Sequence, residues 1–362
     1  MIVRRKKWLS GRPVRALACI VLSAVLVALF FPGCQAGYLR KQAGGALRLI
    51  RDRVEIDSLP PDSLGLRERD GLRWAARVRE FAQAELGLDP GDSYTTYYDT
   101  KGAPISYIVV ASHPLALEPY RWRFPIAGKV PYKGYFDPKD GRAERDRLLR
   151  AGWDAVLLPV GAFSSLGWMS DPILSNMVAK PRGELADLLI HEIAHRTVYF
   201  PDHTDLNESL ATVVAREGTR LLLQREFGQE SREEDEYRRH LASVAAEKLR
   251  DGLVDRLRSD LDALYRSRLP DSEKLKRKAE MFATANVALE KARAGSIEPS
   301  NAVLVLDRQY TGLIPTLERA MAALGGHPRH LVAALSKVSG SADPLAALDR
   351  LVQEGAGSKE GR

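Results

Sequence analysis

The sequence predicts an α+β fold that is predominantly helical, with a small β-sheet before a buried helix and a helical C-terminal part. Three observations favour this class. Short aromatic and β-branched segments, separated by Gly or Pro, gather between residues 94 and 160, as expected of strands. Apolar residues recur at helical spacing on both sides of that region. A long, highly charged helical tract then occupies residues 229–268.

The first 33 residues have the pattern of a signal peptide. Six basic residues precede a hydrophobic run at 16–31, which is shorter than the about 20 residues of a comfortable membrane span. The run ends at Gly33-Cys34, and a small residue before a cysteine is typical of a lipoprotein cleavage site, although Phe31 and Pro32 depart from the usual pattern. We therefore expect Cys34 to be lipidated. An uncleaved signal anchor and ordinary secretion are the alternatives.

This leader affects the net charge of the mature chain, its cysteine content and its expected compartment. Subtracting its six basic residues from the net charge of +7 leaves +1 for the mature chain, so we expect no nucleic-acid partner. The two cysteines are Cys19 and Cys34, which excludes an internal disulfide and a cysteine nucleophile in the mature chain. A lipid or signal anchor places the folded part outside the cytoplasmic membrane, facing the periplasm. Gln35 after the cysteine favours the outer membrane.

Two helices are expected between residues 35 and 88. Val54, Ile56 and Leu59 end the first, and Pro60-Pro61 separates it from the second. Strands are expected next, at 94–98, 105–111, 122–126 and 129–135. A charged helix follows at 138–150, and a strand at 155–160 leads into a loop at 161–168.

The next helix lies between Pro181 and Pro201, residues that break helices. Apolar residues occur all round it, so it should be buried on nearly every side. A further helix is expected from Asn207 to Phe227, with Gly228 as its C-cap.

Helices are also expected in the remainder of the chain. The charged tract at 229–268 turns at 270–272 into a helix that reaches residue 291, typical of a solvated hairpin. Two or three amphipathic helices should follow from residue 303. We divide the chain into a signal peptide (1–33), an N-terminal helical and β-rich part (34–180), a helical C-terminal part (181–354) and a disordered tail (355–362).

The motif His191-Glu192-Ile193-Ala194-His195 carries the clearest chemical information. Histidines four apart on a helix share one face, so both imidazoles can bind a single ion. Glu192 is rotated by about 100° from His191, close enough to act as a general base on a metal-bound water. By composition alone this pattern is expected about 0.01 times in the chain. The motif predicts a metal-dependent hydrolase.

Glu208, in Asn207-Glu208-Ser209-Leu210-Ala211, is the predicted third ligand. The alternative is a capping box, with Asp205 as N-cap and Glu208 reaching back to a backbone amide. His203 competes for the ligand role. However, the metzincin pattern HExxHxxGxxH would need Gly and His where Val198 and Pro201 stand.

The motif pair HExxH and NExxA resembles the gluzincin zinc peptidases. Other segments resemble a family of bacterial proteins described as putative aminopeptidases. The segments are residues 34–38, 130–136 (Val-Pro-Tyr-Lys-Gly-Tyr-Phe), 164–168 with 171–174, and 301–302. This resemblance spans most of residues 34–335 and implies a gluzincin-like zinc aminopeptidase anchored in a bacterial envelope. It implies Zn²⁺ as the cofactor and a peptide as the substrate.

One departure concerns the exopeptidase assignment. Gluzincin aminopeptidases carry a Gly-x-Met-Glu-Asn segment that binds the substrate's amine, and no methionine here is followed by Glu-Asn. The resemblance also implies an edge strand that presents the substrate, for which 155–160 and the loop 164–168 are the candidates. Tyr310 is the candidate for stabilising the oxyanion, its alternative being a core tyrosine.

The resulting hypothesis is a zinc peptidase in which His191, His195 and Glu208 hold the ion, with water at the fourth position. Glu192 takes the water proton and passes it to the leaving amine. The alternatives are a zinc endopeptidase or another amide hydrolase of the cell envelope, and a non-catalytic scaffold stabilised by metal.

Overall fold

The computed structural model describes residues 34–357, apart from residues 61–62, 125–127, 161–169, 229–233 and 342. The fold is α+β and predominantly helical, as the sequence predicts. The chain divides into two compact units, Met1–Arg53 and Val54–Arg362. Helix α2 (Cys34–Asp52) is the described part of the first unit, and the predicted leader lies outside the described residues. The domain division that we predicted at residue 180 falls inside the second unit and stays a prediction.

The segment after α2 is not a continuation of that helix. Strand β1 (Val54–Glu55) and the 3₁₀ turn η1 (Ile56–Ser58) follow it. β1 pairs antiparallel with β2 (Thr96–Tyr98), and β2 pairs parallel with β8 (Ile173–Leu174). Strands of two residues are too short for alternation to reveal, which is why the sequence did not indicate β1 or β8.

Helix α3 (Leu66–Ala84) fixes the start of the metal-motif helix. The indole N–H of Trp74 donates to the carbonyl of Arg182, at 2.9 Å. At Gly71 the backbone comes so close to α5 (Ser175–Val178) that an added Cβ would lie 2.5 Å from the carbonyl oxygen of Val178. The buried residues of α3 are Gly71, Leu72, Trp74, Ala75, Val78, Phe81 and Ala82.

The main sheet has the order β6-β3-β7. Its strands β6 (Tyr132–Tyr135), β3 (Ser106–Ser112) and β7 (Asp154–Val160) are antiparallel. β4 (Trp122–Phe124) and β5 (Gly128–Val130) form a separate two-stranded pair. The expected strand at 122–126 thus extends to residue 124, and its last two positions lie outside the described residues.

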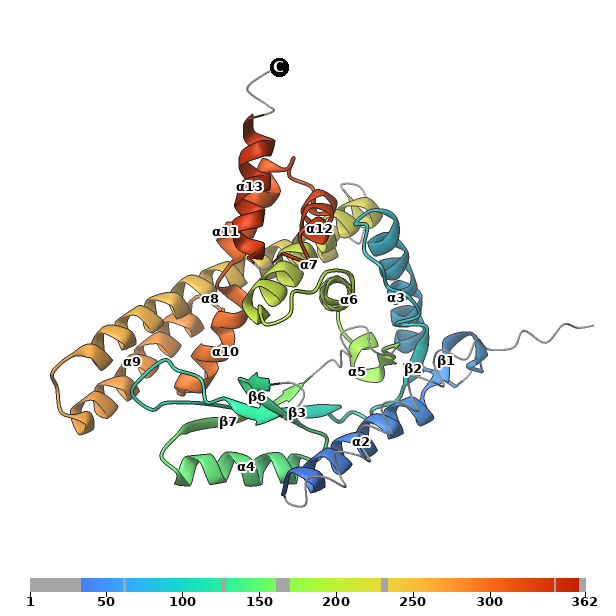
Figure 1. The fold of residues 1–362 in the computed structure, drawn as a ribbon. Coiled ribbons are helices and arrows are strands. Elements are labelled where there is room, and N and C mark those ends of the chain that lie inside the picture. Colours follow the sequence, from blue (N-terminus) through green and yellow to red (C-terminus); the bar gives the residue numbers. More distant parts are fainter. Residues whose placement is uncertain are drawn as a thin grey trace, which may run out of the picture. The chain divides into compact units, whose positions relative to one another are not determined.

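Helices cover both faces of the main sheet (Figure 1). On one face α4 (Pro138–Arg150) packs closely, since a Cβ added at Gly141 would lie 2.6 Å from the side chain of Leu157. On the other face α10 (Asn301–Thr311) places Ala302 against Val110 and Val156. This second face is the one that the metal-motif helix shares.

Helices α6 (Arg182–Thr197) and α7 (Thr204–Phe227) pack together at the centre of the second unit (Figure 1). Glu184 is the exposed residue of α6, so burial on nearly every side is confirmed. A Cβ added at Gly218 of α7 would lie 3.4 Å from Ile190 of α6, which shows how closely the helices approach. α7 begins three residues before the predicted Asn207.

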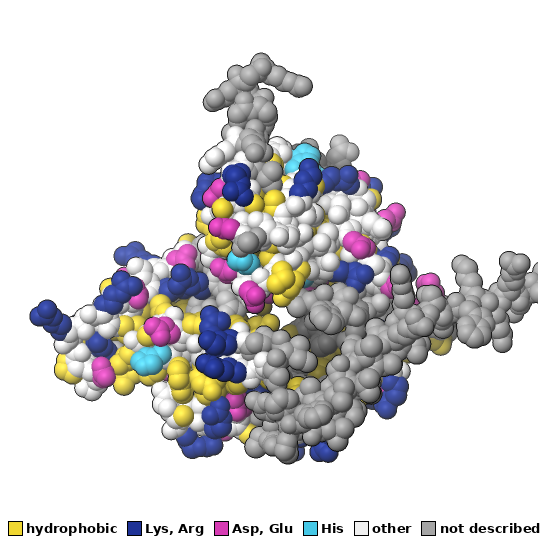
Figure 2. Space-filling view, in the orientation of Figure 1, with side chains coloured by type: hydrophobic (Ala, Val, Ile, Leu, Met, Phe, Trp, Pro, Cys, Tyr) yellow, Lys and Arg dark blue, Asp and Glu magenta, His cyan; other side chains and the backbone are white. Residues whose placement is uncertain are grey.

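Helices α8 (Glu234–Arg266) and α9 (Asp271–Lys291) form the predicted charged hairpin. Figure 2 shows basic and acidic side chains interspersed over its surface. Its inner face joins α10 in an apolar cluster of Val254, Leu257, Leu261, Leu264, Tyr265, Phe282, Leu289, Ile297 and Leu304. Residues 229–233, at the start of the expected tract, lie outside the described residues.

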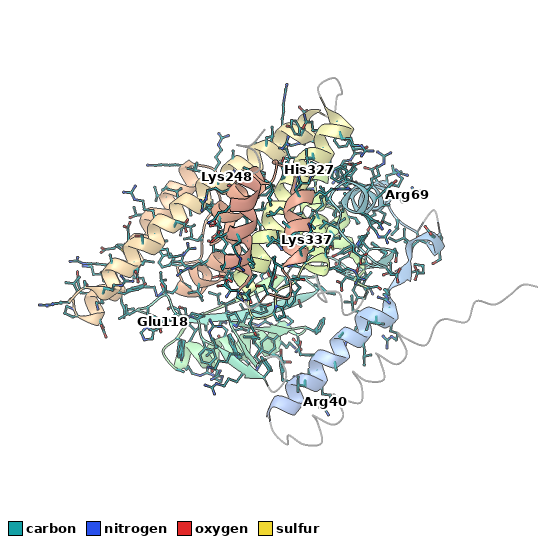
Figure 3. All side chains as sticks on the ribbon, turned by 45° about the horizontal axis from the view of Figure 1, so that its top comes forward. Arg40, Arg69, Glu118, Lys248, His327 and Lys337 are labelled. Atoms are coloured by element: carbon teal, nitrogen blue, oxygen red, sulfur yellow. The ribbon has the colours of Figure 1, made fainter. Side chains whose placement is uncertain are left out.

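The chain ends in α10 and three more helices, α11 (Ile314–Ala323), α12 (Pro328–Lys337) and α13 (Pro344–Gly357), one more than predicted. Lys248 of α8 pairs with Glu318 of α11 at 3.1 Å. Figure 3 labels Lys248, and it labels His327 and Lys337 at the two ends of α12. α13 continues to Gly357, and residues 358–362 of the predicted tail lie outside the described part.

Candidate metal centre

Two histidines lie one turn apart on α6 and point to the same place. Their Nε2 atoms are 3.1 Å apart, and the ring planes cross at 83°. The helix begins after Pro181 and ends before Val198, its C-cap. Because α6 is surrounded by protein, His195 is only 4% exposed, so its orientation is fixed by packing.

The connection between α6 and α7 is held by Asn207. Its side-chain oxygen accepts from the N–H of Phe200, and its side-chain amide donates to the carbonyl of the same residue, both at 2.8 Å. Both residues are buried. These two bonds fix the turn that brings the start of α7 back to the end of α6.

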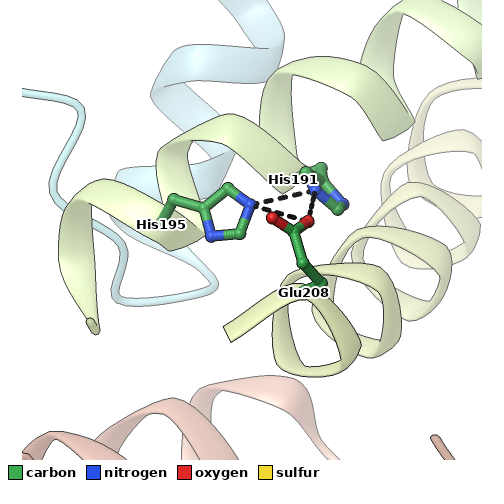
Figure 4. Close-up of side chains that lie close together, drawn as sticks. All are labelled: His191, His195 and Glu208. Atoms are coloured by element: carbon green, nitrogen blue, oxygen red, sulfur yellow. Dashed lines mark hydrogen bonds and ion pairs between the residues drawn. The ribbon is translucent and has the colours of Figure 1, made fainter. Parts of the chain in front are cut away.

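Glu208, the next residue, faces the two histidines (Figure 4). Its Oε2 lies 3.3 Å from Nε2 of His191 and 3.3 Å from Nε2 of His195. The N-cap of α7 is His203, and Asp205 lies inside the helix, where its Oδ1 accepts from the N–H of Leu206. The capping-box alternative is therefore not formed.

The three side chains fit a tetrahedral ion. Ligand atoms at 2.0–2.1 Å from such an ion lie about 3.3–3.4 Å from one another. The observed separations are 3.1, 3.3 and 3.3 Å. Among the described residues, His191, His195 and Glu208 form the cluster that could hold a metal, and His203 is not part of it.

Without an ion, the charges of this cluster compensate one another. Burial raises the pKa of Glu208, but hydrogen bonds with both histidines outweigh it and lower the pKa to about 2. Burial lowers the pKa of His191, and the hydrogen bond to Glu208 with the charges of Glu192, Glu208 and Asp187 raises it above its ordinary value. A bound divalent cation would replace the proton that His191 shares with Glu208 and would compensate the carboxylate charge.

Glu192 lies next to the cluster in the same cleft. Its Oε2 is buried and has no hydrogen-bond partner in the described part of the chain. A buried carboxylate oxygen without a partner is costly. Its place beside the three candidate ligands makes Glu192 a candidate for acid–base chemistry.

The cleft has a volume of about 660 Å³. Residues of α6, α7 and α8 line it, together with residues from the main sheet and α10. The sheet strands contribute Ile108, Tyr132 and Val160. Within the described sheet β7 has β3 as its neighbour and an open edge on its other side. The predicted edge strand thus reaches the cleft, whereas the loop 164–168 lies outside the described residues.

Two tyrosines lie beside the cluster. The ring of Tyr310, on α10, stacks on His191 at 6.4 Å between centroids, and Tyr132 projects from β6 into the same cleft. Both side chains keep part of their surface open to solvent, at 40% for Tyr132 and 39% for Tyr310. Partial desolvation in the cleft, with the Glu208 carboxylate as the next cause, raises the pKa of both phenols, so both stay protonated at neutral pH. Neither hydroxyl makes a hydrogen bond within the described residues, so both are available as donors.

Tyr132 was not singled out from the sequence. The available signal was its position within the Val-Pro-Tyr-Lys-Gly-Tyr-Phe segment at 130–136, which carried part of the family resemblance.

Ser209 explains how Tyr310 is positioned. Its hydroxyl donates to the carbonyl of Tyr310 and accepts from the N–H of Leu313, both at 3.2 Å. The residue after Glu208 thus ties α7 to the end of α10.

Comparison with known proteins adds a family to this geometry. A family model described as "Putative aminopeptidase" matches residues 37–344. The chain belongs to this family. The match includes all three residues of the cluster, the two tyrosines and the cleft, and the family's description indicates a peptidase. Searches of curated proteins and of solved structures returned no match.

The family match begins after the predicted leader. No helix in the described part of the chain is long and apolar enough to cross a membrane. The predicted leader lies outside that part. For Cys34 the structure gives the backbone, as the first residue of α2.

Proposed function

We propose that this protein is a zinc-dependent peptidase of the cell envelope that acts as an aminopeptidase. The observation that carries the proposal is the triangle of two Nε2 atoms and one carboxylate oxygen beside Glu192, in a cleft that can admit a chain. Membership of the aminopeptidase family supports the peptidase assignment.

Zinc suits this donor set. Two imidazole nitrogens and one carboxylate oxygen at tetrahedral spacing are a ligand set of hydrolytic zinc sites, which keep the fourth position open. The order HExxH then NExxA supports the gluzincin class. Bound here, zinc would acidify a water molecule and polarise the scissile carbonyl.

The protein's own groups supply the proton transfers and orientation. Glu192 accepts a proton from the attacking water at its partnerless carboxylate and donates it to the leaving amine. Tyr310 and Tyr132, protonated and without other partners, donate hydrogen bonds to the oxyanion of the tetrahedral intermediate. The edge of β7, which ends in the cleft at Val160, offers backbone groups to an extended peptide.

The envelope location rests on the leader. We propose that Cys34 is lipidated and that the folded part faces the periplasm from the outer membrane, with a signal anchor as the alternative. Labelling cells with a fatty-acid analogue tests this proposal. The wild-type protein should incorporate the label and the Cys34→Ser variant should not.

The function is tested by measuring zinc stoichiometry and then digesting a peptide library with the purified protein. One zinc per chain and removal of N-terminal residues are expected, with activity lost in a chelator and restored by zinc. Cleavage within peptides would instead support an endopeptidase. Release of fragments from purified sacculi but not from free peptides would support another envelope amide as the substrate. Stoichiometric zinc without hydrolysis of either would support a metal-stabilised scaffold.

A further inference from the structure

The cleft continues beyond the metal centre, along α6 toward the start of α8. Four acidic residues line this end. Glu184 and Asp187 come from α6, and Glu236 and Glu247 come from α8. Because an unpaired, partly buried carboxylate is costly, each of these acids is expected to have a cationic partner.

Three of the four acids already have cationic partners. Glu184 pairs with Lys180 at 3.0 Å, and Glu236 pairs with Arg239 at 3.1 Å. Glu247 pairs with Arg216 at 3.2 Å. These pairs compensate the charges within the protein. They leave no unmet requirement for an external ligand.

Asp187 is the exception. Within the described residues it has neither an ion pair nor a hydrogen bond, although it is mostly shielded from solvent. Burial, the largest cause, raises its pKa to about 6, against the opposing charges of His191 and Arg216. Asp187 is therefore a partly buried carboxylate in the cleft wall that forms no ion pair within the described residues, although the charge of Arg216 acts on it.

His240 of α8, which lines the same cleft, also offers a hydrogen-bond acceptor. His240 is buried, and its Nε2 lies 3.2 Å from the carbonyl oxygen of Arg216. Because a carbonyl can only accept, this nitrogen carries the proton and Nδ1 is left as an acceptor. Burial lowers the pKa of His240, which keeps the ring neutral. His240 therefore offers a hydrogen-bond acceptor at this end of the cleft. Because its ring is neutral, it does not repel a bound cation.

The position of Asp187 relative to the metal ligands suits a particular cation. Asp187 precedes His191 by one helical turn, about 6 Å along the axis. In a peptide the α-amino nitrogen is about 2.5 Å from the first carbonyl carbon. A group that binds this amine while the first peptide bond is cleaved must lie on the same side of α6 as the metal ligands. Asp187 lies one turn from His191 on that helix and lines the same cleft.

We propose that Asp187 binds the free α-ammonium group of the peptide substrate and so makes the enzyme remove N-terminal residues. The proposal rests on the proposed peptidase function. In gluzincin aminopeptidases the Gly-x-Met-Glu-Asn segment binds this amine. That segment is absent here, and Asp187 of α6 would take over its role. The paired acids do not compete for this role.

The test compares Asp187→Asn with the wild-type zinc protein on L-leucyl-glycyl-glycine and on its N-acetylated form. Glu184→Gln is the matched control, since Glu184 lines the same cleft on the same helix but is already paired. We expect the wild type to prefer the free amine. Asp187→Asn should lower kcat/KM for it by about 10- to 100-fold, the worth of a charged hydrogen bond. Zinc content and cleavage of the acetylated peptide should be unchanged, and Glu184→Gln should resemble the wild type.

Equal cleavage of both peptides by the wild type would overturn the assignment. So would an equal loss on both peptides in Asp187→Asn, which would indicate that Asp187 only positions His191. Calorimetric binding of L-leucinamide and N-acetyl-leucinamide separates this proposal from the peptidase function. If the zinc protein hydrolyses nothing, tighter binding of the free amine that is lost in Asp187→Asn still supports the role of Asp187. Equal binding of both amides refutes it.

Discussion

Each residue of the Asn207-Glu208-Ser209 segment has a distinct partner. Asn207 holds the backbone of Phe200, Glu208 faces the histidines, and Ser209 binds the backbone of Tyr310 and Leu313. Successive residues of a helix point about 100° apart, so three neighbours can reach three different elements. The position of Glu208 is therefore fixed on both sides by its own neighbours.

At Glu192 we predict that substitution by Gln preserves the metal and abolishes most of the hydrolysis. Gln keeps the size of the side chain but cannot accept the water proton, so kcat should fall by about 10²- to 10⁴-fold. Zinc content by atomic absorption and peptide hydrolysis check this on the same sample. Full activity in Glu192→Gln would contradict the general-base role.

At Glu208 we predict that substitution by Ala lowers zinc affinity by at least about 100-fold, because one of three ligands is lost. The matched control is Asp205→Ala, an exposed acid one turn earlier on α7. It should bind zinc like the wild type. Loss of only about 1 kcal/mol of stability with unchanged zinc, as expected of a capping residue, would refute the ligand role of Glu208.

Proton competition at His191 predicts the pH dependence of zinc binding. The pKa of His191 is raised in the metal-free protein, and its proton must leave before the nitrogen can bind zinc. Affinity should therefore fall as the pH falls below that pKa, by about tenfold per unit. Glu208, with a pKa of about 2, stays ionised over this range. Chelator competition between pH 8 and pH 5 measures the slope, and a flat profile would argue against His191 as a ligand.

At the scale of elements, the turn between α6 and α7 determines whether the third ligand reaches the first two. We predict that Asn207→Ala destabilises the protein by about 2–4 kcal/mol, because it leaves a buried N–H and carbonyl of Phe200 without partners. Zinc affinity should fall as well, because Glu208 is no longer held in place.

The matched control for this change is Asn286→Ala. Asn286 makes the same pair of backbone bonds, to Ile297, at 2.9 and 2.8 Å, but on α9 outside the cleft. Denaturant unfolding and zinc titration of both variants separate the two effects. The two should lose comparable stability, and only Asn207→Ala should lose zinc affinity.

Most elements of this fold could be predicted because their signals are local. Helices α3, α6, α7, α8 and α9 and strands β3 and β7 lie close to their predicted positions, since periodicity and flanking Pro or Gly specify them. The short elements β1, β8 and α5 were missed. They contain two to four residues each, and their structure depends on partners distant in sequence.

At the scale of the whole molecule, a metal held by His191, His195 and Glu208 would join α6 to α7 within the second unit. We predict that zinc at about 100 times its Kd stabilises the protein by about 2.7 kcal/mol, and that a chelator lowers Tm by about 5 °C. The protein should stay folded without zinc, because α3, α10 and the main sheet pack independently of the ion. Calorimetry with and without chelator measures both effects, and complete unfolding on chelation would contradict a site added to a stable core.

The sequence by itself determined the two histidines and Glu192, because residues four or fewer apart on one helix have a spatial relation set by helix geometry alone. Only the tertiary structure decided that Glu208 faces the histidines rather than caps its own helix. It also brought Tyr132 of β6 and Tyr310 of α10 to the same cleft, and showed that Asp187, within the described residues, forms no ion pair such as the other three acids of the cleft form. These relations join elements far apart in the chain, so they depend on how the elements pack.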